Sequence, residues 1–545
     1  MSAVLLLLVL ASQAAQGALP SNAEAERPVA ADTVVVCPAA FREAMRPWIE
    51  YRTQQGHSLA ILSNLGTTDD IRRQIGEVAK GGRLHFVVLV GDAMPGAVSD
   101  PERRQRCVPL HYARARVNVL WGSEPQIATD HCYADLHGTS DAAPQPELAV
   151  GRLTADTPQQ LQQIVAKILA YERTADYGLW RQRLNVVAGM GGFSPLADAI
   201  LESAARYLLT ENVPAVYHLS MTYGSWRSPY CPDPRQFHQT TLERLNEGAC
   251  FWVYIGHGSP LSVDRIHVPG GEYPILSAAD ARQLQCRHGA PIALFLACYA
   301  GAIDARQTCL AEEMLRAPGG PVAIVAGSRV TMPYAMSLLA TGLMKECFRN
   351  GCDTLGDAVL HAKQSLLKEP ASDDRQRAVL DAIAAAISPA PQQLAAERAE
   401  HVLIFNLIGD PLLRLHHPRT IDLQLAPTAA AGAVLTLRGR CPVDGRGTLE
   451  LVVHRDRLTF APPDRSVYPQ SAEALADLQE TYRRANDPRL ASVELPVQGG
   501  RFSAQLAIPA AAAGPCHVCL FVQGDRDCAV GSADVNITAK AALPK

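Results

Sequence analysis

The sequence predicts an α/β protein in which two subdomains with parallel sheets precede a C-terminal β-sandwich. Residues 33–90 alternate between β-branched strands and amphipathic helices, which is typical of a doubly wound parallel sheet. Three short apolar runs between residues 249 and 328 are bounded by Gly, Pro and other small residues, as expected of buried parallel strands. From Ile421 onwards, alternating strands are separated by Gly-containing turns, which indicates a small sandwich.

Length and composition indicate how many domains the chain has and which kinds of partner it lacks. At 545 residues the chain is too long for one domain, and 48% hydrophobic residues are enough for a large core. The net charge of −4 gives no indication of a nucleic-acid partner. We divide the chain into a signal peptide (1–25), an N-terminal α/β subdomain (26–175), a second α/β subdomain (176–418) and the sandwich (419–545).

The N-terminus has the features of a secretion signal. The apolar run Val4–Ala11 precedes small residues and is too short to span a bilayer. We expect cleavage after Ala18 or Ala25, and a mature protein that is secreted, periplasmic or on the cell surface. An uncleaved N-terminal anchor is the alternative, and no other stretch has the length and apolarity of a membrane span.

The cysteines are few for this length and lack the paired CxxC spacing of a zinc domain. In an exported protein some cysteines could form disulfides. The best candidates are Cys441, Cys516, Cys519 and Cys528. Their connectivity cannot be read from the sequence.

The first α/β unit begins at residue 33. Its expected strands are Thr33–Cys37, His57–Ser63, His85–Val90 and Glu147–Arg152. Its expected helices are Phe41–Gln55, Thr68–Lys80 and Pro158–Thr174, the last with one apolar stripe. An irregular polar segment separates the third strand from the fourth.

A second α/β unit follows the first. Its expected strands are Arg183–Ala188, Ala215–Leu219, Ala249–Ile255, Pro291–Ala297, Pro321–Ala326 and Leu403–Ile408. Its expected helices are Leu196–Thr210, Pro234–Asn246, Leu310–Ala317, Tyr334–Phe348, Gly356–Lys368 and Arg375–Ile387. In the sandwich, a helix at Ala472–Ala485 interrupts the strands Val434–Arg438, Thr448–Val453, Ser492–Val497, Arg501–Ala507 and His517–Val522.

Two apolar runs of the second unit lead into a His and a Cys. The first ends in Gly256–Ser259, which contains His257, and the second ends in Cys298–Gly301. Open parallel sheets carry their chemistry at the carboxyl ends of the strands, so His257 and Cys298 form a candidate thiol–imidazole pair. A neighbouring His can supply the thiolate that a Cys nucleophile needs. Taken singly, the Cys could be a buried structural thiol, and Gly-His-Gly is a weak motif.

Acyl transfer also needs donors for the oxyanion. Gly258 has no side chain, so its backbone N–H can approach a carbonyl oxygen closely. The N–H of Cys298 is the natural second donor. In this interpretation His257 also donates the proton to the leaving amine.

These stretches, Tyr254–Ser259 and Leu296–Gly301, resemble the gingipain-like cysteine peptidases of the caspase-like clan. The resemblance covers roughly residues 33–415. Further matching pieces are Val90–Asp92, Thr129–Tyr133, Val150–Leu153, Tyr171–Glu172, Leu310–Glu312, Val322–Ala326 and Phe405–Pro411. Their order and spacing are specific, whereas any single piece is not.

The resemblance implies an endopeptidase that acts on proteins or peptides without a cofactor. Cys298 would be the nucleophile, His257 the general acid/base, and the amides of Gly258 and Cys298 the oxyanion hole. It also implies that residues 176–418 are catalytic and that residues 419–545 are an immunoglobulin-like domain. The alternatives are a catalytically weak or inactive relative that binds at a surface, and a hydrolase or transferase of non-peptide acyl groups. The oligomeric state stays open.

The best-known members cleave after Arg or Lys, using an acidic residue on the helix after the first strand of the second subdomain. Asp198 falls near that place, and Glu202 lies one turn later. A solvated carboxylate at a helix start is the simpler interpretation of both. Members of the family also place an acid before the paired glycines of the preceding loop, where this chain has Met190. An orienting carboxylate must therefore come from elsewhere or be absent.

Five further acidic residues have two interpretations each. Asp92, Asp130 and Asp410 could hold backbone amides or a structural calcium ion, and for Asp410 in Gly-Asp-Pro we favour turn capping. Asp304 and Glu312 follow the Cys and could contribute charge to the site. We favour a structural role for both.

Overall fold

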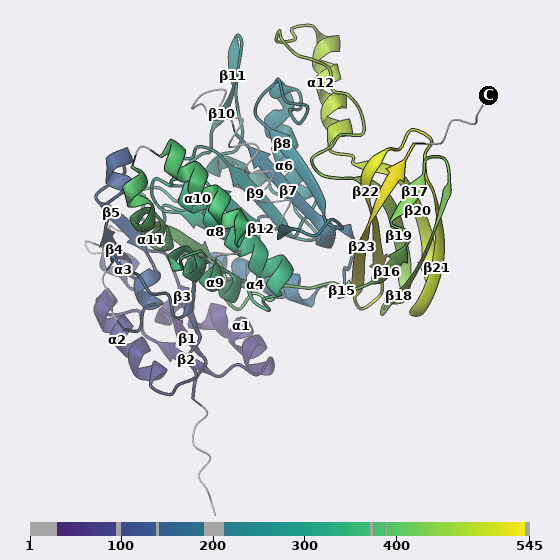
Figure 1. The fold of residues 1–545 in the computed structure, drawn as a ribbon. Helices are drawn as coiled ribbons and strands as arrows, with labels where there is room; N and C mark the ends of the chain where they lie inside the picture. The colour runs from purple at the N-terminus through teal and green to yellow at the C-terminus, as the bar shows by residue number, and fades with distance from the viewer. Residues whose placement is uncertain are drawn as a thin grey trace, which may run out of the picture.

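A computed structural model describes residues 30–93, 100–137, 141–189, 212–370, 374–388 and 390–539. Its centre is a ten-stranded sheet in the order β2-β1-β3-β6-β14-β13-β12-β9-β7-β8 (Figure 1). In chain order these strands are β1 Thr33–Val36, β2 Leu59–Leu62, β3 Phe86–Val90, β6 Ala149–Leu153, β7 Arg183–Ala188, β8 His218–Tyr223, β9 Phe251–Ile255, β12 Ile292–Leu296, β13 Ala323–Gly327 and β14 Phe405–Ile408.

Each half of the sheet consists of parallel strands, and the strands of the two halves run in opposite directions. All neighbouring strands are parallel except β13 and β14, which pair antiparallel. Strand β14 comes from the end of the second unit but pairs with β6 of the first, at Ile408 and Arg152. The two parallel sheets expected from the sequence are therefore joined in one sheet. The carboxyl ends of the strands in one half lie beside the amino ends of the strands in the other half.

Helices cover both faces of the sheet. In β1, Val35 packs in one core cluster with Trp48 of α1 (Arg42–Gln54), whereas Val34 packs in another with Ile71 of α2 (Thr68–Ala79). Successive strand residues point to opposite faces, so α1 and α2 lie on different sides. The other helices of this region are α3 Pro101–Arg104, α4 Pro158–Arg173, α6 Phe237–Asn246, α7 Leu310–Arg316, α8 Pro333–Lys345, α9 Leu355–Leu367, α10 Arg375–Ile387 and α11 Leu394–Ile404.

Helix boundaries follow local capping chemistry. Thr67 and Asp70 form a reciprocal capping box at the start of α2, which satisfies amides that have no partner within the helix. The side chain of Thr157 accepts from the amide of Gln160 at the start of α4, where Pro158 occupies the first helical position. The expected helices at both places are confirmed.

Two hairpins were not expected from the sequence. Strands β4 (His111–Arg114) and β5 (Gln126–Thr129) pair within the irregular segment of the first unit. Strands β10 (Arg265–Val268) and β11 (Gly271–Pro274) pair between β9 and β12. The expected strand Ala215–Leu219 lies three residues later, at β8, while the expected helix Leu196–Thr210 and the signal peptide 1–25 are outside the described residues.

The C-terminal region contains a six-stranded and a three-stranded sheet. One core cluster takes residues from both, including Leu437 and Leu451. The strands are β15 Arg419–Thr420, β16 Asp422–Leu425, β17 Thr428–Ala430, β18 Val434–Cys441, β19 Gly445–Val453, β20 Arg489–Val497, β21 Gly500–Ala507, β22 Gly514–Gln523 and β23 Cys528–Thr538. Helix α12 (Ala472–Ala485) interrupts them between β19 and β20 and projects away from the sheets (Figure 1). The immunoglobulin-like assignment stays a prediction.

The disulfides considered for this region are not formed. All fourteen cysteines lie in the described residues and are unbridged. Cys516 stands opposite Val535, while Cys528 stands opposite Gln523 at the other end of the same ladder. Cys516 and Cys441 face the core, whereas Cys519 packs in a separate cluster with Val216. Among the described residues, no helix has the length and apolarity needed to cross a membrane.

Candidate active site

His257 and Cys298 stand at equivalent positions after neighbouring strands. Strands β9 and β12 are parallel and adjacent, and Ile255 is in register with Leu296. The pairing continues one step further, because the amide of Gly256 donates to the carbonyl of Leu296 at 3.2 Å. His257 and Cys298 each follow two residues after the same register pair, on strands about 4.8 Å apart. The His257 side chain is exposed, and Cys298 is partly buried.

Gly258 brings its backbone against Cys298. A Cβ at Gly258 would lie 2.5 Å from the carbonyl oxygen of Cys298 and 3.0 Å from the Cβ of Ala297. These contacts are too close for any residue with a side chain, so only Gly allows this approach. The glycine predicted as an oxyanion donor therefore lies beside the predicted nucleophile.

The two amides predicted to bind an oxyanion are available. Gly258 forms an antiparallel bridge with Val263, but the bonds of that bridge come from the residues beside it: Asp264 N–H donates to His257 O at 3.2 Å, and Ser259 N–H donates to Ser262 O at 2.8 Å. Within the described part of the chain, neither the Gly258 nor the Cys298 amide donates a hydrogen bond. This is the arrangement that an oxyanion site needs.

The sulfur of Cys298 contacts the loop after β13. The amide of Thr331 donates to Sγ at 3.3 Å, and the Thr331 hydroxyl lies 3.6 Å from Sγ. These two contacts fix the position of the sulfur beside the loop. Thr331 was not singled out from the sequence, where nothing distinguishes it from other loop hydroxyls.

Tyr299 holds a strained backbone directly after the nucleophile candidate. Its φ of 59° is the only positive value at a non-glycine residue in the described chain, and this conformation costs a bulky residue about 1–2 kcal/mol. The Tyr299 amide donates to Arg329 O at 3.2 Å, and its hydroxyl donates to Glu124 at 2.7 Å. These bonds offset the strain and hold the turn that presents Cys298.

Arg329 organises the charge behind this turn. Its guanidinium donates to both carboxylate oxygens of Asp304, at 2.8 and 2.6 Å. It also lies 3.6 Å from Glu124. Asp304 is therefore a partner of Arg329, which agrees with the structural role favoured from the sequence.

The loop that carries His257 is held by Tyr254. The Tyr254 hydroxyl donates to His257 O at 3.0 Å and accepts from the Asp264 amide at 3.2 Å. Burial raises the pKa of Tyr254 far above its ordinary value, so this hydroxyl stays protonated. In the sequence Tyr254 belongs to an apolar run and is indistinguishable from the core residues beside it.

Asp264 lies beside this loop, because its amide donates to His257 O at 3.2 Å. A Cβ at Gly189 would lie 3.3 Å from Asp264 Oδ2, and Gly189 immediately precedes Met190, where the family pattern has an acid. Met190, Asp198 and Glu202 are themselves outside the described residues. Their roles stay predictions.

The remaining acidic candidates have structural partners away from the pair. Asp130 binds Arg152 at 2.5 Å, and Asp410 binds Arg52 at 2.6 Å. Asp410 Oδ1 also accepts from the amide of Leu412 at 2.9 Å, which confirms its turn-capping role. Because β3, β6 and β14 run opposite to β9 and β12, their carboxyl ends lie at the edge away from His257 and Cys298.

Glu312 and Asp92 share a buried cluster with Arg316. Glu312 Oε2 accepts from the Cys309 amide at 3.0 Å at the start of α7, and Arg316 lies 3.5 Å from Glu312 and 3.6 Å from Asp92. Burial, followed by the nearby charge of Asp92, raises the pKa of Glu312. The cluster caps a helix, so Glu312 has the structural role favoured from the sequence.

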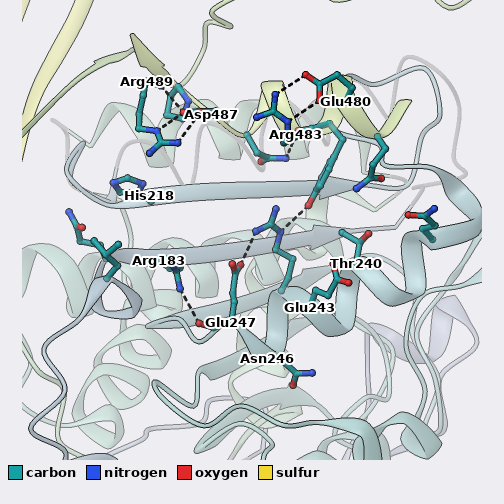
Figure 2. A pocket seen from close by; sticks show the side chains of 18 of the residues that line it. Arg183, His218, Thr240, Glu243, Asn246, Glu247, Glu480, Arg483, Asp487 and Arg489 are labelled. Carbon is teal, nitrogen blue, oxygen red and sulfur yellow. Dashed lines mark hydrogen bonds and ion pairs between the residues drawn. The ribbon is translucent and has the colours of Figure 1, made fainter. Parts of the chain in front are cut away.

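A large cavity lies away from this site. It has a volume of about 1260 Å³ and lies between the second half of the sheet and the C-terminal region (Figure 2). Residues from β8 and α6 line one side, and residues around α12 line the other. Both acidic and basic side chains line it, among them Glu247, Arg183 and Asp487. We regard it as the gap between two polar surfaces, since size alone does not identify an active site.

Comparison with known proteins decides the family. The model of peptidase family C25 matches residues 26–416. The chain belongs to peptidase family C25. The expected resemblance to gingipains is thereby confirmed.

Two characterised relatives are Lys-gingipain and Lys-gingipain 381 of Porphyromonas gingivalis. Each is 22% identical over 296 residues, which are 52% of this chain but 15% of the relative. The chain thus spans a small part of the length of these relatives.

Among solved structures, the Arg-specific cysteine proteinase gingipain R aligns with a TM-score of 0.52 at 15% identity, over 94% of this chain and 100% of that chain. The complex of Porphyromonas gingivalis RgpB pro- and mature domains aligns with a TM-score of 0.51 at 15% identity, over 93% of this chain and 100% of that one. This likeness shows that the chain shares the fold of these two structures.

Proposed function

We propose that this C25 protein is an exported cysteine endopeptidase in which Cys298 and His257 form the catalytic dyad. The contact between the Gly258 backbone and the Cys298 carbonyl carries the proposal. It sets two unused amides next to the candidate nucleophile, at the strand ends where a parallel sheet carries its chemistry. Membership of a peptidase family supports the choice of a peptide bond as the substrate.

The residues perform complementary steps. The Cys298 thiolate attacks the scissile carbonyl carbon, and the negative charge that forms on oxygen is stabilised by the amides of Gly258 and Cys298. His257, as imidazolium, protonates the leaving amine. Water activated by the neutral His257 then hydrolyses the thioester and restores the thiol.

Labelling with a peptide chloromethyl ketone tests the dyad. We expect one adduct per chain, mapped to Cys298 by peptide mass analysis, and no hydrolysis of peptides by Cys298→Ala. Cys286→Ala is the matched control, because Cys286 is also partly buried but lies away from the strand ends. An adduct on another cysteine, or unchanged hydrolysis by Cys298→Ala, would exclude the proposed nucleophile.

We further propose a preference for Arg or Lys before the scissile bond, with Asp198 as its acceptor. The names of the relatives, Lys-gingipain and an Arg-specific proteinase, support a basic side chain. Peptides with Arg, Lys or a neutral residue at that position separate the cases. Asp198→Asn should lower kcat/KM for the basic peptides only. Equal rates on all three peptides would contradict this preference, and hydrolysis of esters alone would contradict the peptidase itself.

We also propose that the C-terminal region is an immunoglobulin-like domain, that residues 1–25 are removed on export, and that no cofactor is needed. The two sheets around one apolar core support the first assignment. Mass analysis of the protein recovered from the medium or the cell surface would identify the mature N-terminus. Full activity after dialysis against a chelator would support a reaction without a metal.

A further inference from the structure

Three metal-binding side chains converge at the end of α8, away from the dyad. They are Glu346 at the start of a π-helical turn (Glu346–Asn350), Cys352 in the following loop, and His361 in the second turn of α9. We propose that they bind one zinc ion. This site is independent of the peptidase function, since none of the three residues belongs to the proposed catalytic machinery.

The spacing of the three ligand atoms fits a tetrahedral ion. Cys352 Sγ lies 3.3 Å from Glu346 Oε2 and 3.5 Å from His361 Nδ1, and Glu346 Oε2 lies 3.5 Å from His361 Nδ1. Zinc bonds of about 2.3 Å to sulfur and about 2.0–2.1 Å to nitrogen and oxygen separate tetrahedral ligands by about 3.3–3.6 Å. All three edges of the triangle agree with that geometry.

The backbone fixes these ligands before an ion arrives. Gly351 has a φ of 67° and reverses the chain after the π turn, and the Cys352 amide donates to Glu346 O at 3.1 Å. The neighbour of Glu346 in the turn, Cys347, is buried. Thr354 caps α9 by accepting from the amide of Asp357, so the helix that carries His361 starts at a defined point.

Hydrogen bonds from neighbouring residues orient the three proposed zinc ligands. The Asn350 amide group donates to Glu346 Oε1 at 2.8 Å, which leaves Oε2 to face Cys352 and His361. His417 contacts the Cys352 carbonyl at 2.8 Å. Such outer contacts are typical of protein metal sites. The His361 side chain is 45% exposed, so water can occupy a fourth position and ions can enter from solvent.

The donor set favours zinc over harder ions. One thiolate, one imidazole and one carboxylate suit a borderline-soft ion, whereas calcium and magnesium take oxygen ligands. Binding replaces the thiol proton of Cys352, which passes to solvent. The bound ion would join the end of α8 to α9 and stabilise the helices on this face of the sheet.

Two other groups of three such residues in the described chain have competing contacts. In one, His517 Nδ1 lies 2.7 Å from Asp534 Oδ1, which is a direct hydrogen bond, and the ring of His454 stacks on His517 at 4.0 Å. In the other, the carboxylate of Asp527 already accepts from Arg419 at 2.9 Å.

Zinc titration of the full chain tests the site. The parent for all variants is Cys298→Ala, because the proposed dyad could itself bind zinc. After treatment with a chelator, the parent should take up one Zn²⁺ per chain in competition with a chromogenic chelator. Glu346→Gln, Cys352→Ser and His361→Gln should each weaken binding at least about tenfold. Cys286→Ser and His517→Gln are matched controls that should bind as the parent does.

Cobalt supplies a readout that a general loss of structure would not imitate. Co²⁺ bound to the parent should give a thiolate-to-cobalt absorption band in the near ultraviolet, lost in Cys352→Ser and kept in Cys286→Ser. Zn²⁺ should raise the Tm of the parent but not of the three ligand variants, whose Tm without metal should match the parent. If Cys352→Ser does not fold, Glu346→Gln and His361→Gln decide. No Zn²⁺ uptake by the parent at micromolar concentration, or unchanged affinity in the folded ligand variants, would overturn the proposal.

Discussion

The proposed oxyanion site requires a residue without a Cβ at position 258. In Gly258→Ala the new Cβ would meet the Cys298 carbonyl at 2.5 Å, so the loop must move and its amide must leave the oxyanion position. Loss of one oxyanion donor lowers kcat by about 100-fold or more. Steady-state kinetics should show this loss in kcat with little change in KM. Gly76→Ala is the control, because nothing lies within 4 Å of that position, and equal activity of both variants would contradict the role of Gly258.

Tyr254 supports the same loop from inside the sheet. Tyr254→Phe removes the hydroxyl that donates to His257 O and accepts from the Asp264 amide. We expect a loss of about 1–2 kcal/mol in the free energy of unfolding, together with a lower kcat because His257 is less well positioned. Urea unfolding and kcat of the variant measure the two effects. Tyr273→Phe, on the β10–β11 hairpin, should change neither, and an unaltered kcat in Tyr254→Phe would show that the loop is held by other contacts.

At the scale of elements, the loop after β13 depends on a buried histidine in α11. His401 Nε2 accepts from the Met332 amide at 2.8 Å, and Nδ1 donates to Glu397 O at 2.7 Å. The bond accepted from Met332 requires an unprotonated Nε2 and therefore the neutral ring, whereas Nδ1–H donates to the carbonyl in either state. Burial lowers the pKa of His401 from 6.5 to about 4. Met332 follows Thr331, which contacts Cys298, so protonation of His401 would disturb the site as well as the fold.

This histidine predicts a defined acid sensitivity. Below pH 6.5 the unfolded chain takes up a proton at His401, while the folded chain does so only near pH 4. Stability therefore falls as the pH drops through this window, by up to about 3 kcal/mol. His401→Gln, which can make both hydrogen bonds without titrating, should lose less stability between pH 7 and pH 4.5 in urea unfolding. His267→Gln, an exposed control, should behave as the parent, and identical pH dependence of all three proteins would contradict the assignment.

The elements also show what the sequence could and could not predict. Buried parallel strands such as β9 and β12 are identifiable because their apolar runs end in Gly or Cys, and the register then follows from the fold. The β10–β11 hairpin was missed although Pro269–Gly270 forms a two-residue turn, with Gly270 at a φ of 92°. The place of β14 between the halves was not predictable, because antiparallel pairing with β13 depends on chain reversal far along the sequence. Thr331 approaches Cys298 only through that tertiary arrangement.

At the scale of the whole molecule, the C-terminal region is attached to one half of the sheet. Helix α12 contacts this half through Tyr482, whose hydroxyl bonds Thr222 at 2.9 Å and accepts from Arg244 at 2.9 Å. Asn486, at the end of α12, makes two bonds with the backbone of Met221. These contacts use side chains of α12 on backbone and side-chain groups of β8 and α6. The inserted helix is thus one part of the C-terminal region that contacts this half of the sheet.

Arg455 makes three further hydrogen bonds between the C-terminal region and the rest of the chain. Its guanidinium donates to the carbonyls of Val213, Pro214 and Tyr217 at 2.6, 2.6 and 2.8 Å, and burial lowers its pKa to about 10. Arg455→Met removes these three hydrogen bonds, and a buried carbonyl left without a donor costs about 1–3 kcal/mol. In calorimetry we expect the C-terminal region to unfold separately, at a lower temperature than in the parent. Arg446→Met is the control, because its partner Glu494 lies within the same sheet and both side chains are exposed. A single transition at the parental temperature in Arg455→Met would mean that α12 alone holds the two domains together.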